Sequence, residues 1–199
     1  MAAPVSIAHT HVHALRLAGG AEALAARVRI ADGTPGYGFT LNLEPAVARD
    51  MATWDAFARA RAVPLYGLLG GLYRKSVILT TDQSPALPAD WAALRKDLHG
   101  AKREPLRIDP FAWGAVEMVP TIAAVASSYG LGIALLAPNA HVWEIQYCAA
   151  LAASLRLEET KVIVHQNVAQ ESIQISDRPG IGIDWTAEPA FSRLEWQER

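Results

Sequence analysis

Residues 50–71 read DMATWDAFARARAVPLYGLLGG and contain most of a helix followed by an apolar turn. Apolar residues before and within this stretch recur at spacings of three and four, which predicts an amphipathic helix; they are Val47, Met51, Trp54, Phe57 and Ala58. Pro45 suits the first turn, and we expect the helix to end near Val63 and Pro64. The turn then leads into KSVILTTD, which predicts a buried strand at 77–81. The stretch therefore joins the helix of one region to the first strand of another.

The region before this junction has the pattern of a small sheet. Residues 5–17 alternate in the manner of a strand, and residues 24–30 form a plausible partner. The pairs Asp32-Gly33 and Pro35-Gly36 supply a turn before GYGFTLNL. We expect three short strands in a β-meander.

The region after the junction alternates strands and helices. The pattern predicts strands at 106–109, 133–137 and 162–165 and helices at 88–99, 113–129 and 143–155. This alternation favours a parallel α/β arrangement. Two short extended pieces are expected at the end, around Arg178, Pro179 and Gly180.

Composition excludes several classes of protein. The 199 residues include 18 basic and 20 acidic side chains and carry a net charge of −2, which argues against nucleic acid and anionic membranes as partners. The uncharged stretch 118–139 is long enough to span a bilayer, but Pro120, two serines and two glycines divide it. A single cysteine, Cys148, excludes an internal disulfide and is interpreted as a small buried hydrophobe. The start of the chain lacks a signal segment, so we expect a cytoplasmic protein.

Three motifs resemble one known family. The meander followed by RDMATWDAFARARAVPLYGLLGG and KSVIL is similar to the junction of capping domain and barrel in the mandelate racemase and muconate lactonising branch of the enolase superfamily. IDPFAWGAVEMVPTIAAVASSYGLGIAL resembles that family's sixth barrel strand, helix and seventh strand, and SDRPGIGIDWTAEPAF resembles its closing segment. The resemblance implies an α/β protein with an α+β cap, residues 1–72 and 168–199, and an incomplete TIM-like barrel of three to four strands, residues 73–167.

The centre of the family's barrel has no counterpart in the sequence. The resemblance implies magnesium ligands on the third, fourth and fifth strands and often a Lys-x-Lys pair on the second. Only residues 82–104 separate the first-strand and sixth-strand motifs, and the chain contains no Lys-x-Lys. A complete barrel takes about 250 residues, so residues 76–167 cannot close one. We therefore predict no metal and no cofactor.

A few polar residues remain as site candidates. Asp109, at the end of the sixth-strand motif, and His141 and His165 are the catalytic candidates, while Asp82 and Gln166 are candidates for binding substrate. Each has a plainer interpretation. Asp109 suits a helix cap ahead of Trp113, Asp82 suits a turn, and His141 lies in a loop. We interpret four glutamates as solvated helix positions or caps: Glu117, Glu144, Glu158 and Glu159.

Three histidines alternate near the start of the chain. A strand projects His9, His11 and His13 from one face, which is compatible with zinc or nickel. No fourth ligand is evident, and an exposed or interface face explains the pattern equally.

Three functions follow as hypotheses. The leading one is a truncated, non-catalytic homologue that assembles with itself or with a full-length acid-sugar dehydratase or racemase. Its apolar fraction of 51% fits extra surface buried in an oligomer. The second is a small lyase or isomerase that abstracts a proton from a carboxylic acid with Asp109, His141 or His165. The third is a carboxylate-binding module.

Overall fold

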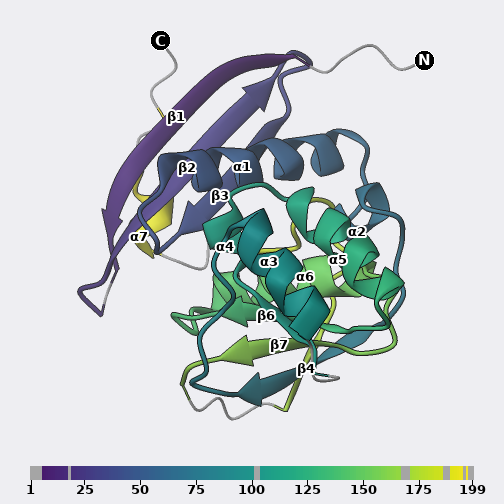
Figure 1. Ribbon diagram of the computed structural model, residues 1–199. Helices are drawn as coiled ribbons and strands as arrows, with labels where there is room; N and C mark the ends of the chain where they lie inside the picture. The colour runs from purple at the N-terminus through teal and green to yellow at the C-terminus, as the bar shows by residue number, and fades with distance from the viewer. Residues whose placement is uncertain are drawn as a thin grey trace. The chain divides into compact units, whose positions relative to one another are not determined.

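The computed structural model describes residues 6–17, 19–100, 104–166, 171–185, 189–194 and 196. The chain divides into two compact units (Figure 1). Unit 1 comprises Met1–Leu65 and Asp177–Arg199, and unit 2 comprises Tyr66–Ser176. The domain bounds given above, at 72 and 168, stay a prediction.

The sheet of unit 1 is an antiparallel meander, as the alternating pattern predicted. β1 (Ile7–Arg16), β2 (Glu22–Ile30) and β3 (Pro35–Thr40) lie side by side in chain order. In Figure 1 they are the purple and blue arrows. The register sets His11 opposite Arg27, so the histidine face of β1 also carries arginines from β2.

Helix α1 (Pro45–Ala60) packs on the meander at unusually close range. Glu44 caps its first turn, where the carboxylate accepts a hydrogen bond from Ala46 N at 3.2 Å. A Cβ atom at Gly36 or Gly38 would lie within 3.0 Å of helix backbone, so only glycine fits on the facing strand. The core beneath is accordingly rich in alanine: Ala26, Ala48, Ala52 and Ala56 pack there with Val28 and Ile30.

This close approach changes the buried stripe of α1. The sequence placed Trp54 and Phe57 in the stripe, but both are only half-buried. The fully buried positions are Val47, Ala48, Met51, Ala52, Asp55, Ala56 and Ala58. Small side chains face the sheet because the two backbones are too close for larger ones.

The sheet of unit 2 holds five strands in the order β5-β6-β7-β4-β8. Their bounds are β4 (Ser76–Thr81), β5 (Leu106–Ile108), β6 (Ile133–Ala137), β7 (Thr160–Val164) and β8 (Ser172–Gln174). The first four strands in this order are parallel, and β8 pairs antiparallel with β4. The first and last strands of the predicted partial barrel, β4 and β7, are therefore neighbours.

The helices of unit 2 are α3 (Trp91–Gly100), α4 (Pro110–Trp113), α5 (Met118–Ser128) and α6 (Val142–Ser154), with α2 (Leu65–Leu68) at the division of the chain. The helix predicted at 113–129 is present as α5, but its predicted start is wrong, because Trp113 ends the separate short helix α4. Gly114 ends α4 with φ 79°, a left-handed conformation that stops a helix. α5 connects β5 to β6, and α6 connects β6 to β7. Both connections join parallel neighbours in the same direction across the sheet, and because such crossovers are right-handed, the two helices cover the same face. The helices described here are all too short or too polar to cross a membrane.

The chain pairs both edges of this sheet itself. β8 adds a strand to the outer side of β4. On β5, Leu87 N donates to Arg107 O at 2.8 Å, while Leu106 N points to β6 by donating to Gly132 O at 3.0 Å. The sequence led us to expect edges that a partner must cover. Among the described residues, β8 pairs with the edge at β4, and the segment before α3 covers part of the edge at β5.

Candidate functional site at the carboxyl ends of the parallel strands

Three predicted site residues follow directly after parallel strands. Asp109 follows β5, His165 follows β7 and Asp82 follows β4. The pairing of Thr81 with Val164 sets Asp82 and His165 at equivalent positions. We call this edge of the sheet the carboxyl edge. Open and closed α/β sheets bind their ligands at such edges.

Asp109 is the N-cap of α4. Its Oδ1 accepts hydrogen bonds from Phe111 N at 2.9 Å and from Ala112 N at 3.2 Å. Burial raises the pKa of the carboxyl, against these two N–H donors and the positive charge of His165, which lower it. The capping interpretation therefore holds, and the carboxyl lies close enough to His165 for their charges to interact.

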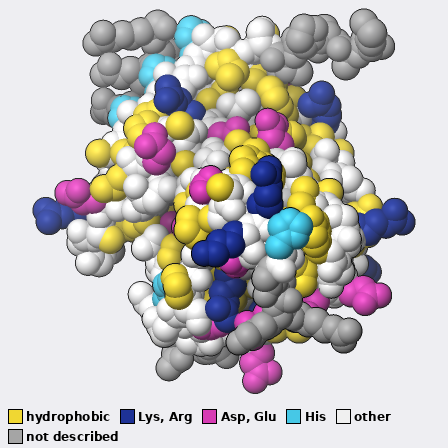
Figure 2. Space-filling view, viewed as in Figure 1, with side chains coloured by type: hydrophobic (Ala, Val, Ile, Leu, Met, Phe, Trp, Pro, Cys, Tyr) yellow, Lys and Arg dark blue, Asp and Glu magenta, His cyan; other side chains and the backbone are white. Residues whose placement is uncertain are grey.

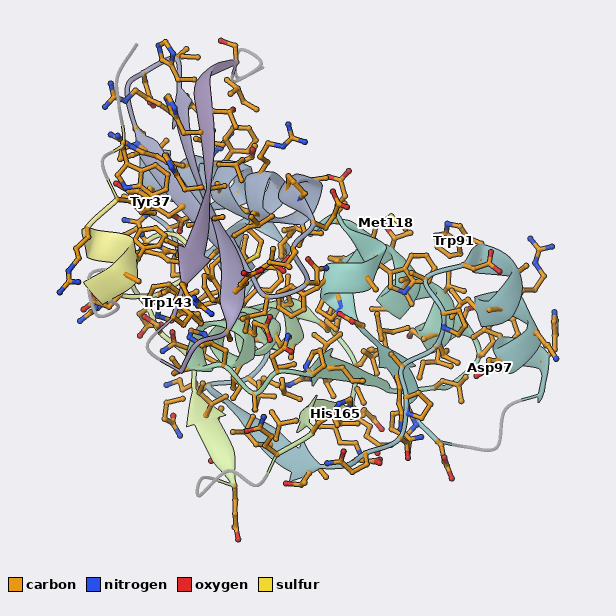
Figure 3. The ribbon with its side chains drawn as sticks, turned by 90° about the vertical axis from the view of Figure 1, so that its left-hand side faces the viewer. Tyr37, Trp91, Asp97, Met118, Trp143 and His165 are labelled. Carbon is orange, nitrogen blue, oxygen red and sulfur yellow. The ribbon has the colours of Figure 1, made fainter. Side chains whose placement is uncertain are left out.

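His165 is half-buried within unit 2 (Figure 3). Its backbone carbonyl accepts a hydrogen bond from Gln83 Nε2. Its Nε2 is buried and has no hydrogen-bond partner among the described residues. A buried ring nitrogen beside a carboxyl of raised pKa is the kind of pair that moves protons in enzymes. The catalytic role of either residue stays a prediction.

The interaction of these two groups is open to direct measurement. Replacing His165 by glutamine removes the positive charge that stabilises the Asp109 carboxylate, so the pKa of Asp109 should rise further. Carbon-detected NMR of the labelled aspartate carboxyl reports the midpoint. An unchanged midpoint would show that the two side chains do not interact.

The raised pKa also fixes a pH dependence for unit 2. The native state holds the Asp109 proton more tightly than the unfolded chain does, so this group's contribution to stability is greatest at low pH. It is lost as the pH rises from the ordinary carboxyl pKa to the raised one. The Asp109→Ala variant should lack this loss, although it also loses a helix cap worth about 1 kcal/mol. Urea unfolding at several pH values measures both effects.

His141 caps a different helix. Its Nδ1 accepts a hydrogen bond from Trp143 N at 3.2 Å at the start of α6, and the two rings meet edge to face with centroids 5.6 Å apart. Because Nδ1 accepts, the ring proton of the neutral form lies on Nε2. Gln166 follows His165 and is exposed. The structure gives neither residue a catalytic or binding contact, and both roles stay predictions.

Asp82 holds a cation at the carboxyl edge. Its Oδ2 accepts from Arg107 Nη2 at 2.9 Å and its Oδ1 accepts from Ser84 N at 2.8 Å. Hydrogen bonds from Ser84, together with the charges of Arg107 and Lys161, lower the pKa of Asp82. The carboxylate is therefore ionised and engaged within the chain, in a turn of the kind the sequence suggested.

Residues 82–88, which we call the strap, cross one face of the sheet. The strap leaves β4 at Asp82 and reaches β5 at Leu87. Ala86 packs on the cluster formed by Ala134, Leu136 and Ile163. The register of β6 and β7 puts these three residues on one face of the sheet, and no described residue of α5 or α6 belongs to the cluster, so we infer that this is the face away from these helices. The strap thus lies on the side that is the interior in a closed barrel.

Sequence reasoning missed a buried carboxylate beneath the carboxyl edge. Glu144 was interpreted as a solvated position or cap, but it is only 1% exposed, and Asn139 Nδ2 lies 3.2 Å from each of its carboxylate oxygens. The solvated interpretation is therefore wrong. Its apolar neighbours in VWEIQY were the available signal, since a solvated helix face is rarely flanked so closely by tryptophan and isoleucine.

Cys148 lies in the same buried region. Its Sγ is 3.4 Å from Leu136 O, and the side chain is fully buried, which confirms the interpretation as a small hydrophobe. Burial, followed by the negative charges of Glu144 and Asp109, raises the pKa of the thiol well above its ordinary value. A thiol in this state is not a nucleophile at neutral pH.

The described residues of this chain do not fit the magnesium site that the resemblance implies. Among the described residues no group of three His, Cys, Asp or Glu side chains is placed to hold a metal ion. Asp82 is engaged by Arg107, and Asp109 Oδ1 by the first turn of α4. The histidine face of β1 is equally unsuited, because His11 has Arg27 directly opposite and His9 has Arg29. The absence of a cofactor itself stays a prediction.

Comparison with known proteins places the fold. No protein-family model matches the chain, and no curated protein matches its sequence. Solved structures do match. An enolase from Pseudomonas fluorescens with bound magnesium, potassium and tartrate superposes with a TM-score of 0.71 at 12% identity, covering 90% of this chain and 90% of that one.

Two further structures agree. A mandelate racemase/muconate lactonizing enzyme from Bordetella bronchiseptica gives a TM-score of 0.72 at 13% identity, covering 93% of this chain and 99% of that one. A racemase from Streptomyces coelicolor with bound magnesium gives 0.65 at 14% identity, covering 95% and 100%. At these identities the likeness concerns the fold alone. The chain therefore has the enolase-superfamily fold that its junction and strand motifs predicted.

Proposed function

We propose that this protein is a non-catalytic homologue of the enolase superfamily that acts as a subunit of an assembly. The loss of catalysis is inferred from the position of the strap. It lies on the inner face of the sheet, and its first residue, Asp82, pairs with Arg107 at the carboxyl edge. Residues of the chain itself thus take the place where a barrel enzyme of this fold receives its substrate.

The chemistry of the fold supports the same conclusion. A proton next to a carboxylate is very weakly acidic, so its removal needs fixed positive charge where the enediolate forms. In the proteins that this chain resembles, carboxylates on the central strands hold that charge. The segment between β4 and β5 contains the strap and α3 and has no strand among its described residues.

Proton exchange tests the loss of catalysis. The protein is incubated in D₂O with Mg²⁺ and a panel of α-hydroxy acids and acid sugars, and loss of the α-proton signal is followed by NMR. We expect exchange at the rate of the protein-free control. Magnesium-dependent exchange would contradict the proposal and would show that the ligands lie elsewhere in the chain.

Exposed apolar side chains of unit 2 support the assembly half of the proposal. Ile78 on β4 is 62% exposed, an unusual position for isoleucine in a central strand pairing with β7 and β8. Other large apolar side chains of unit 2 are exposed as well: Leu72, Tyr73, Trp91, Tyr129 and Val142. In Figure 2, positively and negatively charged side chains are interspersed over the face that is shown. Because such a face offers a partner no single charge sign, we expect apolar contacts to drive association.

Native mass spectrometry of the purified protein tests assembly. We expect a homo-oligomer, or a complex with a full-length enzyme of this fold when the two are expressed together. Ile78→Lys should shift the distribution toward the monomer, while Lys96→Ala on the exposed side of α3 serves as a control. A monodisperse monomer under both conditions would contradict the subunit role. A cytoplasmic location stays a prediction.

One observation favours a second function. Asp109 and His165 lie close enough at the carboxyl edge for their charges to interact, and the buried Nε2 of the histidine has no hydrogen-bond partner in the described part of the chain. This pair suits metal-independent proton abstraction from a carboxylic acid by a small lyase or isomerase. Turnover of the same substrates that survives chelation, and that Asp109→Asn and His165→Gln each abolish, would establish this alternative.

A further inference from the structure

Unit 1 contains a cavity beside the meander. Its volume is about 550 Å³, within the range of small-molecule sites. Strand β3, the end of α1 and described residues between 178 and 196 contribute to its wall. The lining residues are Tyr37, Arg59, Arg178, Pro179, Ile183, Asp184, Trp185, Phe191 and Trp196. We call this space the cap cavity.

Aromatic rings form much of the wall of the cap cavity. Tyr37 lies beside α7 (Pro189–Ser192), drawn in yellow in Figure 3, and its ring centroid is 5.7 Å from that of Phe191. Trp185 and Phe191 stack at 5.3 Å with an angle of 26° between their planes. Trp185 and Phe191 are only 5% and 4% exposed, so they form the apolar backing of the wall. The half-buried rings of Tyr37 and Trp196 supply the surface that a planar, aromatic ligand can contact.

Arg59 gives the wall a fixed hydrogen-bond donor. Its Nε donates to Asp55 Oδ2 at 2.6 Å, and its guanidinium carbon lies 5.7 Å from the centre of the Tyr37 ring. The side chain keeps 29% of its surface exposed. Asp55 and Tyr37 therefore hold the guanidinium in place at the cavity wall, and no described residue accepts a hydrogen bond from its two Nη groups. A pre-positioned planar guanidinium is the side chain best matched to a carboxylate.

The preference for an anion rests on the geometry of Arg59 and not on a surplus of positive charge. The charge of Arg59 is balanced by Asp55, and the lining also contains Arg178 and Asp184, one of each sign. The fixed guanidinium is therefore the group that distinguishes a carboxylate from a neutral ligand of the same shape.

We propose that the cap cavity binds a small aromatic carboxylate, with the ring against Tyr37 and Trp196 and the carboxylate on Arg59. The site lies wholly in unit 1 and shares no residue with the carboxyl edge of unit 2. It is therefore independent of the proposed loss of catalysis, and its test requires no turnover.

Titration of the full chain with 2-naphthoate tests the site. Isothermal calorimetry gives the affinity, and the indole N–H signal of Trp185 in NMR spectra gives the location. The uncharged control is 2-naphthylmethanol, which has the same ring system. We expect 2-naphthoate to bind with a Kd below about 1 mM and about tenfold more tightly than the alcohol. Equal affinities, or no shift of the Trp185 signal, would overturn the proposal.

Three variants separate the carboxylate contact from effects on folding. Arg59→Lys keeps a cation beside Asp55 but loses the fork of two Nη donors, so affinity should fall about tenfold. Arg178→Gln changes only an exposed side chain and should weaken binding about threefold. Arg61→Lys, on the same helix end and outside the lining, should bind as the wild type does. Wild-type affinity in both of the first two variants would overturn the assignment.

Discussion

Replacing Asp55 by asparagine is expected to unfold unit 1 at denaturant concentrations that leave the wild type intact. Asp55 is fully buried, and its carboxylate accepts from Tyr37 N at 2.9 Å, Arg59 Nε at 2.6 Å and Ile181 N at 2.8 Å. In asparagine an NH2 group replaces one of the two carboxylate oxygens. Its two N–H bonds would face N–H donors that need an acceptor. Removing one partner of a buried charge pair costs about 3–5 kcal/mol.

The burial of Asp55 explains why the effect should be so large. Burial raises the pKa of this carboxyl, against Arg59 and the two backbone donors, which lower it. These three donors come from α1, from β3 and from the returning segment at Ile181, so one side chain ties three parts of unit 1 together. Gly180, with φ +88°, leaves room for it, because a Cβ there would collide with Asp55 Oδ1.

Urea titrations read out by hydrogen exchange of residues 22–40 measure the stability of unit 1 separately from unit 2. The matched control is Asp97→Asn, which removes an exposed carboxylate from α3 (labelled in Figure 3) and should change stability by less than about 0.5 kcal/mol. A loss of under about 1 kcal/mol in Asp55→Asn would contradict the role of Asp55 as a joint.

Gly38→Ala should destabilise unit 1 by about 3 kcal/mol or more. A Cβ at this position would lie within 3.0 Å of Ala48 O and Ala52 N, which are backbone atoms of α1. Its own backbone has no positive φ, so the cost is purely steric. Trimming Ala48 to glycine cannot relieve the collision, since the carbonyl oxygen remains. The helix would have to move away from the strand, which opens the core of alanines.

Thermal unfolding of Gly38→Ala beside Gly19→Ala provides the comparison. A Cβ at Gly19 meets no heavy atom within 4 Å, so that variant should lie within about 0.5 kcal/mol of the wild type. The double variant Gly38→Ala, Ala48→Gly should be no more stable than Gly38→Ala alone. Recovery of stability in the double variant would show that the collision involves the Ala48 side chain instead.

Much of the fold was accessible to sequence reasoning because it follows regular periods. The meander and the alternation of strands and helices after Ser76 are repeating patterns, and strand ends place Asp82, Asp109 and His165 at one edge. Gly114 was a visible signal that went unused; it ends α4, and the helix predicted from residue 113 begins only at Met118.

The remaining features depend on contacts between distant residues, which no local pattern encodes. The burial of Asp55 requires a donor at Ile181, and the burial of Glu144 requires Asn139 in the preceding loop. The course of the strap depends on an ion pair across the sheet between Asp82 and Arg107. The pairing of β8 with β4 joins segments nearly a hundred residues apart. Charged residues in apolar surroundings were the best warning that such partners existed.

The direction of β8 has a consequence for any attempt to enlarge the sheet of unit 2 by design. A strand-helix unit grafted after Thr81 would need to pair in parallel with β4, on the side where Ser172, Ile173 and Gln174 already pair in the opposite sense. The new strand would have to displace β8 before it could form its first hydrogen bonds to β4. Such a design therefore begins with the removal of a strand and not with an insertion.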